Sequence, residues 1–417
     1  FTSGSDTITI NGLSGDENIT GPDLASSIYG SSGNDTITGG NANDIIDGGD
    51  DNDIMDGGAG TNTLSYATAS AAVTVDLSNG AQQNTIGSGL DTLSNFDKVT
   101  GSDHDDTLTG NDNANLIGGK NGDDTILGGG GDDTLRGNAG NDNIDGGLGN
   151  DQLTGDSDDD TFNITSGVDS VTDLSTGDIL IISSGATVNA ANISTFVATN
   201  STSNGGTANL TAGNSGSTIT LTNSTSGFYT VTGGSGVDNL TGGSGNDIID
   251  GLGGNDILYG GTGGDTLTGG STGVYIIDVG LGDGSVDNVN LTGVVSFSNR
   301  DNIYSFNAGE DIVRIVNTSL TGSATAGGEI TVGGTADATK IYIDSISNLG
   351  SSGINIGDQS VTYTSGGYAY ASDTGALFYD ADGDWCAGSI QVAAVYSTAY
   401  LGADTAANLG FADFQFG

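Results

Sequence analysis

Thirteen aspartates share one position of a nine-residue repeat, and their carboxylates are the strongest candidates for chemistry in this sequence. The unit is Gly-Gly-x-Gly-x-Asp-x-apolar-x, which reads clearly at residues 128–136 and 242–250. Calcium takes about six to eight hard oxygens from carboxylates and carbonyls, so aspartates at a fixed phase predict calcium ligands. The thirteen candidates are Asp35, Asp44, Asp53, Asp106, Asp124, Asp133, Asp142, Asp151, Asp160, Asp238, Asp247, Asp256 and Asp265.

One turn cannot supply so many oxygens, but two turns stacked at the ~4.8 Å strand spacing can, with a carboxylate from each. Two nonapeptides make one circuit of a coil, so stacking partners are expected 18 residues apart. The alternative is that each aspartate only caps its own turn by accepting hydrogen bonds from backbone N–H groups. Thirteen aspartates at the same position of the repeat favour a role as metal ligands instead. The predicted pairs are Asp35 with Asp53, Asp124 with Asp142, Asp133 with Asp151, Asp142 with Asp160, and Asp238 with Asp256.

Turns and short strands must position these aspartates. Six residues of each unit read as a turn and three as a strand, and a fixed short period of this kind is typical of a stacked solenoid. Glycine at the first and fourth positions is expected because the turn needs φ values that only glycine adopts at low cost.

An apolar eighth residue is predicted to line the interior of the coil. It is present in all 21 units, from Ile8 to Ile276. The aspartate of the sixth position is less regular, and other residues replace it at Glu17, Ser26, Asn62, Asn115 and Val274. The coils at the ends of each block are therefore predicted to be ordinary β-rungs, without metal, and those in the middle to hold metal.

The blocks and the segments between them predict an all-β fold, with calcium-loaded parallel β-roll solenoid blocks and intervening and C-terminal β-sandwich-like segments. Period-two alternation predicts further strands near 72–77, 179–182, 217–222, 311–316 and 340–343. The expected domains are a first β-roll block (1–65), a connector with a β-strand (66–91), a second block (92–163), a β-rich insertion (164–223), a third block (224–277) and a C-terminal β-rich domain (278–417).

The composition also excludes several classes of protein. The net charge is −47, with 6 basic residues against 53 acidic ones, so nucleic acid would be repelled and bound metal is the economical way to compact the chain. No stretch approaches the ~20 apolar residues of a membrane helix, so membrane insertion is not expected. The single cysteine, Cys386, allows no intrachain disulfide and is expected to be an inert, partly buried thiol; an intermolecular disulfide is the alternative.

With these residues in view, the chain resembles the repeats-in-toxin (RTX), or haemolysin-type calcium-binding, family. The resemblance extends to the connector (63–77 and 91–102) and to the C-terminal segments 373–384 and 411–416. It implies a parallel β-roll and a secreted bacterial protein exported by the type I secretion machinery through an uncleaved C-terminal signal. Phe1 is followed by neither a basic nor an apolar leader segment, which fits that route or a processed start.

Calcium would then control folding. Without it the carboxylates repel one another, so the chain is expected to stay unfolded in a calcium-poor cytosol and to fold outside, where calcium is millimolar. Extracellular calcium modules typically bind at about 10⁻⁴–10⁻³ M.

Nothing in the sequence favours an enzyme, and no catalytic residue is predicted. His104, the only histidine, falls at the fourth position of a repeat and is expected to serve the turn. Neither a H-E-x-x-H zinc site nor a G-x-S-x-G nucleophile elbow is present. The cluster at 380–384 could hold another calcium, and Tyr363, Tyr368, Tyr370, Phe378 and Tyr379 could form a sugar platform, although core packing is favoured for these aromatics.

The leading expectation is a secreted calcium-binding structural protein of the bacterial cell surface: a surface-layer, sheath or filament subunit that assembles with copies of itself. It rests on a solenoid that starts within the first residues without a capping element, because an open end exposes unpaired backbone. The alternative is the calcium-binding export portion of a larger RTX adhesin or exoenzyme. A carbohydrate-binding module is a third, weaker interpretation.

Overall fold

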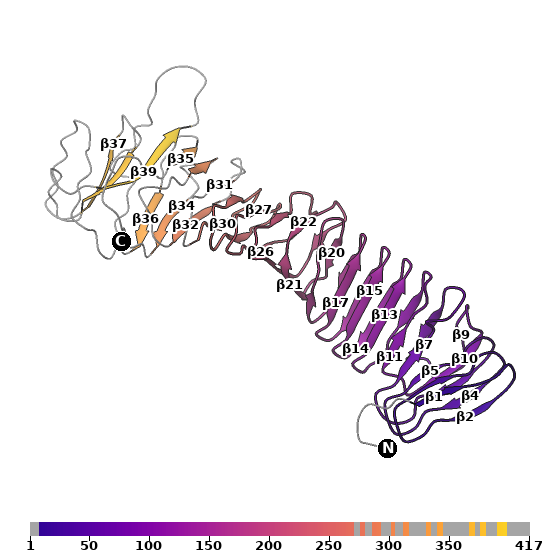
Figure 1. The fold of residues 1–417 in the computed structure, drawn as a ribbon. Helices are drawn as coiled ribbons and strands as arrows, with labels where there is room; N and C mark the ends of the chain where they lie inside the picture. Colours follow the sequence, from indigo (N-terminus) through magenta and orange to yellow (C-terminus); the bar gives the residue numbers. More distant parts are fainter. Residues whose placement is uncertain are drawn as a thin grey trace. The chain divides into compact units, whose positions relative to one another are not determined.

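The computed structural model describes residues 8–270, 276–279 and 286–290 in full; it describes the backbone alone of residues 291–292 and of further strands between residues 302 and 397. Every regular element in the described residues is a β-strand (Figure 1). The strands are short because each turn of the coil returns after a few residues. The chain divides into two compact units: residues 1–191 with 198–208, and residues 192–197 with 209–417.

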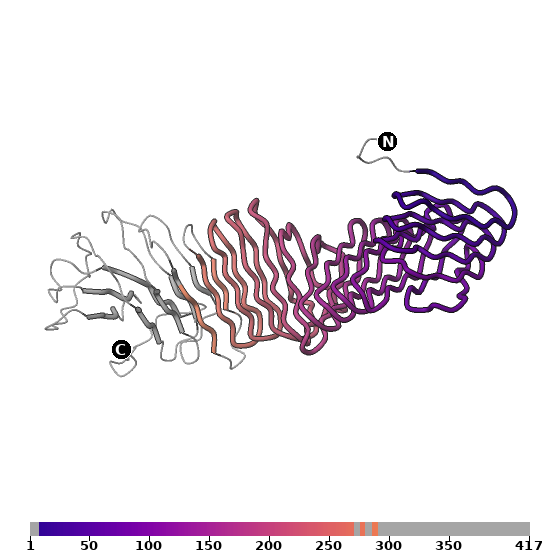
Figure 2. The backbone as a smooth tube through the Cα atoms, turned by 90° about the horizontal axis from the view of Figure 1, so that it is seen from below, coloured from indigo at the N-terminus to yellow at the C-terminus, as the bar shows by residue number. Residues whose placement is uncertain are grey.

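The first unit is a roll with two strand-bearing faces, and Figure 2 shows its successive coils lying one on another. The first face holds β1 (Ile8–Asn11), β3 (Ser26–Tyr29), β5 (Ile45–Asp47), β7 (Thr63–Ser65), β11 (Lys98–Thr100), β13 (Leu116–Asn121), β15 (Thr134–Ala139), β17 (Gln152–Ser157), β19 (Val168–Val171) and β21 (Thr187–Ile193). The second face holds β2 (Asn18–Thr20), β4 (Thr36–Thr38), β6 (Ile54–Asp56), β8 (Thr74–Asp76), β9 (Gln83–Asn84), β10 (Leu90–Ser94), β12 (Thr107–Thr109), β14 (Thr125–Gly130), β16 (Asn143–Leu148), β18 (Thr161–Ile164), β20 (Ile179–Ile182) and β23 (Ser203–Asn204).

Register in the repeat blocks follows the 18-residue circuit. Ile126 of β14 lies opposite Leu108 of β12 and Ile144 of β16, and both pairings are parallel. These side chains are fully buried, as the apolar eighth position predicts. The predicted inward ladder of isoleucine and leucine is therefore confirmed in the described blocks, and its core is one residue wide on each face.

The ladder departs from prediction at two places. Ile10, not Ile8, is the register partner of Ile28, because the two-residue slip before Gly12 shifts the first rung. In the last unit Ile277, not Ile276, pairs with Leu258, since that circuit is 19 residues long and moves the inward position by one. The second correction changes the inward residue because successive side chains alternate across a strand, whereas the first, a two-residue shift, keeps the same face.

The connector replaces one rung of the second face by a three-stranded meander. β10 runs parallel to β6, β9 runs antiparallel to β10, and β8 runs parallel to β12. An antiparallel bridge between Val73 and Ile86 joins the start of β8 to the residues after β9. On the first face β7 pairs directly with β11, so the first and second blocks form one roll.

The segment after the second block adds further rungs to the same unit. β19 pairs with β17, β20 with β18, β21 with β19 and β23 with β20, all in parallel. Leu180 stacks under Phe162, and both side chains are fully buried. The predicted strand at 179–182 is confirmed as β20.

The second unit repeats the two-faced arrangement. One face holds β26 (Tyr229–Thr232), β28 (Ile248–Asp250), β30 (Thr266–Thr268), β32 (Asn288–Thr292), β34 (Ile312–Val316) and β36 (Lys340–Asp344). The other holds β22 (Thr195–Val197), β25 (Thr218–Thr220), β27 (Asn239–Thr241), β29 (Ile257–Tyr259), β31 (Ile276–Asp278), β33 (Asn302–Tyr304), β35 (Thr331–Gly334), β39 (Ile390–Ser397), β38 (Ala376–Asp380) and β37 (Gly367–Ala371). β24 (Thr207–Ala212) has residues in both units.

Parallel pairing continues through most of the second unit. β34 pairs with β32 and β36, whereas β37 and β38 form an antiparallel pair. The predicted strands at 311–316 and 340–343 are confirmed as β34 and β36. The fold is thus an all-β parallel β-roll. The expected sandwich-like C-terminal part lies largely outside the described residues.

Candidate metal sites in the turns

All thirteen predicted aspartates lie buried in the turns immediately before strands. Each is at most 2% exposed. A buried ionised carboxylate is costly unless it is paired, hydrogen-bonded or bound to a metal. The partners of these side chains therefore decide what the turns can do.

One oxygen of each carboxylate ties neighbouring rungs together. The backbone N–H of an aspartate donates to Oδ1 of the aspartate one circuit later: Asp124 to Asp142 at 2.8 Å, and Asp142 to Asp160 at 2.9 Å. All five predicted stacks are present in the structure. The other three are Asp35 on Asp53 (2.8 Å), Asp133 on Asp151 (2.8 Å) and Asp238 on Asp256 (3.0 Å).

The second oxygen separates the turns into two kinds. In one kind Oδ2 is buried and has no hydrogen-bond partner; these aspartates are Asp35, Asp53, Asp124, Asp133, Asp142, Asp151 and Asp256. In the other kind Oδ2 accepts the N–H of the second residue of its own turn, as at Asp44, Asp106, Asp238 and Asp247. A buried oxygen without a donor requires an explanation, and a bound cation supplies one.

Backbone oxygens lie close to the same place. A Cβ on Gly128 would stand 2.2 Å from Asp133 Oδ2 and 2.4 Å from the carbonyl oxygen of Gly146, one circuit later. At Gly30 the corresponding distances, to Asp35 Oδ2 and the Gly48 carbonyl, are 2.4 and 2.3 Å. The first glycine is therefore required by close approach, which leaves space where a carboxylate and a carbonyl of the next rung converge.

The reason predicted for the glycines is partly wrong. The first residue of the turn is not left-handed; positive φ falls at the second and fourth residues, as at Gly129 (98°) and Gly131 (96°). The fourth position follows the prediction. The second position also admits residues with a Cβ, among them Ser31 (87°) and Asn138 (83°).

These donors fit calcium. The turns offer hard oxygens alone, carboxylate and carbonyl, and calcium prefers such ligands over nitrogen or sulfur. In the part of the chain that the structure describes, no three acidic or histidine side chains converge on one point. An ion in a turn would therefore take much of its coordination from backbone carbonyls.

Burial makes these carboxylates difficult to ionise in the absence of metal. Desolvation raises the pKa of Asp124 to about 8 and the pKa values of Asp53 and Asp160 to about 7. The neighbouring carboxylates add to the shift, because like charges one rung apart disfavour a second charge. A bound divalent cation would instead favour the ionised form of these carboxylates.

We expect the metal-free roll to gain stability on mild acidification. The folded-state pKa values are raised, so these groups contribute stability that is complete below the unfolded value of about 3.8 and is lost as the pH rises through about 6 to 8. In EDTA the β-strand signal in circular dichroism should therefore be weak at pH 8 and should recover as the pH falls to 5. A β signal that weakens over this range would contradict the assignment.

Sequence reasoning missed five acidic residues that extend the ladders. They occupy the sixth position of rungs whose glycine turns have degenerated, and the surviving signal is Asp-x-apolar, as in Asp169-Ser170-Val171. Asp151 donates to Asp169 at 2.9 Å, and Asp160 donates to Asp178 at 3.0 Å. The five are Asp91, Asp97, Asp169, Asp178 and Asp287.

At the connector, protein groups donate hydrogen bonds to the ladder carboxylate. Oδ2 of the fully buried Asp91 accepts the hydroxyls of Tyr66 (2.9 Å) and Thr85 (2.8 Å). Asn62 stands where a turn aspartate is expected, and its Nδ2 donates to the carbonyl of Asn95 at 3.2 Å. The prediction that block ends are ordinary rungs is consistent with these contacts.

A second ladder was also missed, at the fifth position of the turns. Its Asn and Asp side chains accept the N–H of the residue one circuit later, as Asp123 does from Asn141 (2.7 Å) and Asp132 from Asn150 (2.9 Å). These side chains are exposed, and their hydrogen bonds run opposite to those of the buried ladder. The repeated Asn or Asp before the conserved aspartate was the available signal.

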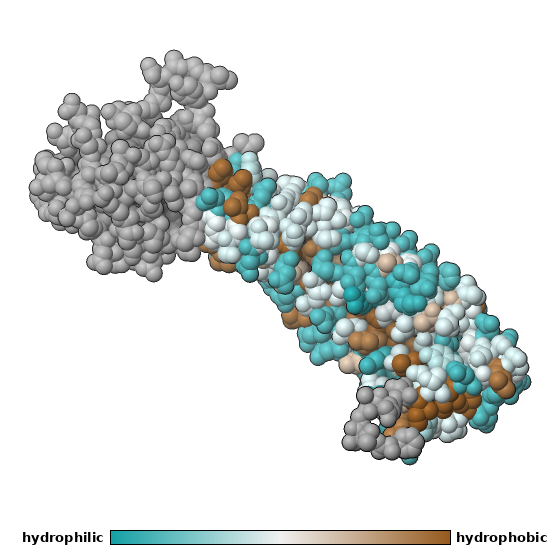
Figure 3. All heavy atoms as spheres, in the orientation of Figure 1, coloured by the Kyte–Doolittle hydropathy of each residue, from teal (hydrophilic) through white to brown (hydrophobic). Residues whose placement is uncertain are grey.

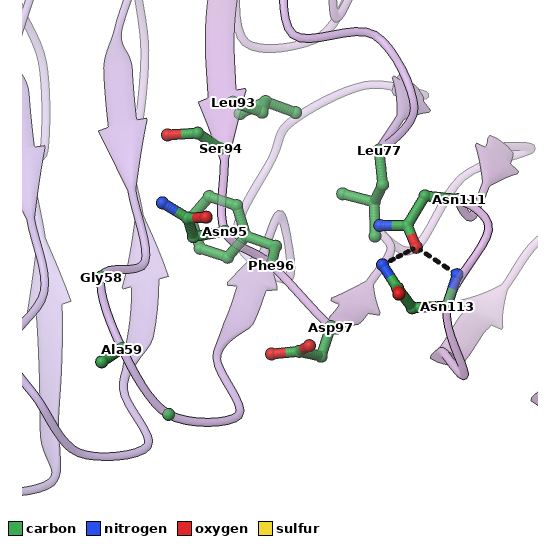
Figure 4. A pocket seen from close by; sticks show the side chains of 11 residues that line it. Gly58, Ala59, Leu77, Leu93, Ser94, Asn95, Phe96, Asp97, Asn111 and Asn113 are labelled. Carbon is green, nitrogen blue, oxygen red and sulfur yellow. Dashed lines mark hydrogen bonds between the residues drawn. The ribbon is translucent and has the colours of Figure 1, made fainter.

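A polar pocket of about 280 Å³ lies beside the connector, lined by the turn at 58–60, residues 93–97, Leu77, Asn111 and Asn113 (Figure 4). Asn113 donates twice to Asn111, from its backbone N–H and from Nδ2. Asp97 is the one titratable side chain among the lining residues, and its Oδ2 already accepts the N–H of Asn62 at 2.9 Å. The pocket therefore offers no pair of groups for acid–base catalysis.

Several predicted features lie elsewhere. His104 is exposed in the turn at 101–106, apart from this pocket. Cys386, the side chains of 380–384 and of the five aromatic residues, and most of the expected C-terminal secretion signal lie outside what the structure describes. In the part of the chain that is described, no helix is long and apolar enough to cross a membrane.

Comparison with known families agrees with this geometry. The model of the RTX calcium-binding nonapeptide repeat (4 copies) matches residues 29–64, 91–126, 100–135, 127–162 and 232–267, which together make up about a third of the chain and fall in all three blocks. No curated protein matches the sequence. The chain is therefore one that carries RTX calcium-binding nonapeptide repeats, folded as a parallel β-roll.

Proposed function

We propose that this is a secreted structural protein of the bacterial surface that folds on extracellular calcium and assembles with copies of itself. The observation that carries the proposal is the buried ladder of carboxylates whose Oδ2 atoms have no protein donor. Such a chain is poorly suited to a calcium-poor cytosol, because its net charge of −47 is concentrated in closely stacked rungs. Calcium binding outside would supply folding free energy directly.

The proposed metal ligands are the thirteen predicted aspartates, with Asp169 and Asp178 added from the structure. Asp91 is left out because its Oδ2 is already satisfied by two hydroxyls. Several ions are expected, since the open carboxylates recur in both units. Export would use the type I secretion machinery, in keeping with the family resemblance.

A non-catalytic role is supported by the nature of the repeated site. Aspartates repeated in similar buried turns give no pair whose pKa values are driven in opposite directions, which acid–base chemistry needs. The chain has a single histidine, and it is exposed on a turn. The roll therefore serves best as a scaffold.

Self-assembly is supported by the first described rung. Ile10 and Ile19 are only half-buried, whereas their successors Ile28 and Ile37 are fully buried, and Leu13 is 76% exposed. Figure 3 shows apolar colour gathered near this end of the first unit, on a face that is otherwise mostly hydrophilic or pale. A rung from a second molecule, stacked on this end, would bury these side chains.

We expect light scattering to show oligomers that grow at millimolar calcium and dissociate in EDTA. Leu13→Lys should suppress assembly and leave the β signal intact, and Leu148→Lys, at a position 67% exposed but far along the roll, serves as the matched control. A folded, calcium-loaded chain that stays monomeric would contradict self-assembly. Mass spectrometry of the native protein tests the alternative, because additional upstream residues would favour the export portion of a larger adhesin or exoenzyme.

A further inference from the structure

The aspartate turns adopt two backbone conformations. In the first, the second and fourth residues are both left-handed, as in the turn at 146–151 with Gly147 at 91° and Gly149 at 135°. These are called receptive turns; they also comprise 30–35, 48–53, 119–124, 128–133, 137–142, 155–160, 251–256 and 260–265. Oδ2 of the sixth residue is buried without a donor in the receptive turns that end at Asp35, Asp53, Asp124, Asp133, Asp142, Asp151 and Asp256.

In the second conformation neither residue is left-handed. These are called capped turns, and they comprise 39–44, 101–106, 233–238 and 242–247. Here the N–H of the second residue points at the carboxylate: Gly40 donates to Asp44 Oδ2 at 2.8 Å, and Gly243 donates to Asp247 Oδ2 at 2.7 Å. A backbone donor thus sits where a cation would otherwise approach.

In two receptive turns the second N–H has a different partner. Gly147 donates to Asp145 Oδ1 at 3.0 Å, and Leu252 donates to Asp250 Oδ1 at 3.0 Å. In both cases the acceptor is the residue directly before the turn. The N–H is therefore held away from the sixth residue, which leaves Oδ2 free of protein donors.

The fourth residue accounts for the conformation of two of the four capped turns. Receptive turns carry Gly or Asp there, the types that adopt left-handed φ at least cost. Two capped turns carry Ala42 and His104 at this position, whose Cβ atoms oppose it. The other two carry Gly236 and Gly245, which permit either conformation.

We propose that the turns form two classes of calcium site. Receptive turns bind calcium first, and capped turns bind it only after the N–H of the second residue rotates away from the carboxylate. The fourth residue of the turn sets the free-energy cost of this rotation. This inference rests on the proposed role of the sixth-position aspartates as calcium ligands. Calcium at a capped turn must displace a hydrogen bond from a carboxylate, so its apparent affinity is reduced by the cost of opening.

His104 provides a sharp test, because it is exposed and can be replaced without disturbing the core. Hydrogen exchange of the full chain across a calcium titration should show that amides of 119–151 become protected at lower calcium than those of 101–106. His104→Gly should lower the midpoint of the 101–106 turn by about fivefold, given the cost of left-handed φ for residues with a Cβ. His104→Ala removes the same imidazole but keeps the Cβ, and should leave this midpoint unchanged.

The sign of the effect separates the outcomes. A glycine that only loosened the unfolded chain would raise the midpoint, so a rise in His104→Gly, or equal midpoints in all turns, would overturn the two classes. Ala42→Gly repeats the test in a second turn, where the 39–44 midpoint should also fall. The absence of calcium-dependent protection in every turn would instead refute the calcium ladder itself, and with it the proposed function.

Discussion

Removal of calcium with EDTA at neutral pH should abolish most of the β-strand signal of the chain. The described rolls contain stacked, buried carboxylates whose second oxygens have no protein donor, and each is one rung from the next. Without a cation these groups must either ionise in a desolvated place or bind protons, and at neutral pH both are unfavourable. Folded proteins are stable by only about 5–15 kcal/mol, so several such penalties together exceed the total.

Circular dichroism and sedimentation, measured together during a calcium titration after chelation, would check this. The signal should return cooperatively as calcium reaches about 10⁻⁴–10⁻³ M. Magnesium is a suitable control, because it demands octahedral geometry and gives up its waters reluctantly, so it should restore much less structure. A melting temperature and β signal that are the same in EDTA and in calcium would show that the ladder is satisfied by the protein alone.

The fold could be predicted from the sequence because two signals repeat at one period. The apolar eighth residue gives the strand and its inward face, and the glycines give the turns, so the 18-residue circuit follows from arithmetic. The pairing of Ile126 with Ile144, and of Asp124 with Asp142, required no further information. Prediction was weakest where the period changed: a slip of two residues moves the first rung to Ile10, and a slip of one residue at Ile277 exchanges the two faces of the strand.

The connector could not be predicted in the same way. Its three strands form a meander that closes one face, and its buried groups depend on partners distant in sequence. Tyr66, Thr85 and Asp91 meet only because β9 folds back on β10. No local pattern marks them, although Asp91-Thr92-Leu93 keeps the Asp-x-apolar triplet.

The sequence predicted correctly which aspartates stack on one another, but it did not predict the backbone conformation of the turns. The sixth-position aspartates stack as expected, since periodicity fixes their neighbours. Periodicity does not give backbone dihedrals, so the glycines were assigned one role when they have two: close approach at Gly128 and left-handed φ at Gly131. The division into receptive and capped turns depends on the same dihedrals, and only the fourth residue hints at it in the sequence.

Ile126→Asp should destabilise the roll severely, and added calcium should not restore it. Ile126 is fully buried between Leu108 and Ile144, so the variant loses apolar burial and places an unpaired carboxylate in the ladder, at a combined cost of about 5 kcal/mol or more. Leu127→Asp is the matched control, because Leu127 is the next residue of β14 but is 36% exposed; its melting temperature should change little.

Asp133→Ala should respond to calcium in the opposite way. The variant removes Asp133 Oδ1, which accepts the N–H of Asn115 at 2.7 Å, and the buried Oδ2 that has no protein donor, so it should weaken the calcium sites of the adjoining rungs and raise the calcium midpoint. Because the inward ladder remains intact, excess calcium at the neighbouring rungs should recover most of the fold. Melting temperatures measured across a calcium series would separate the two cases. A similar recovery of Ile126→Asp and Asp133→Ala would contradict the assignment of the eighth position to the core and of the sixth position to calcium binding.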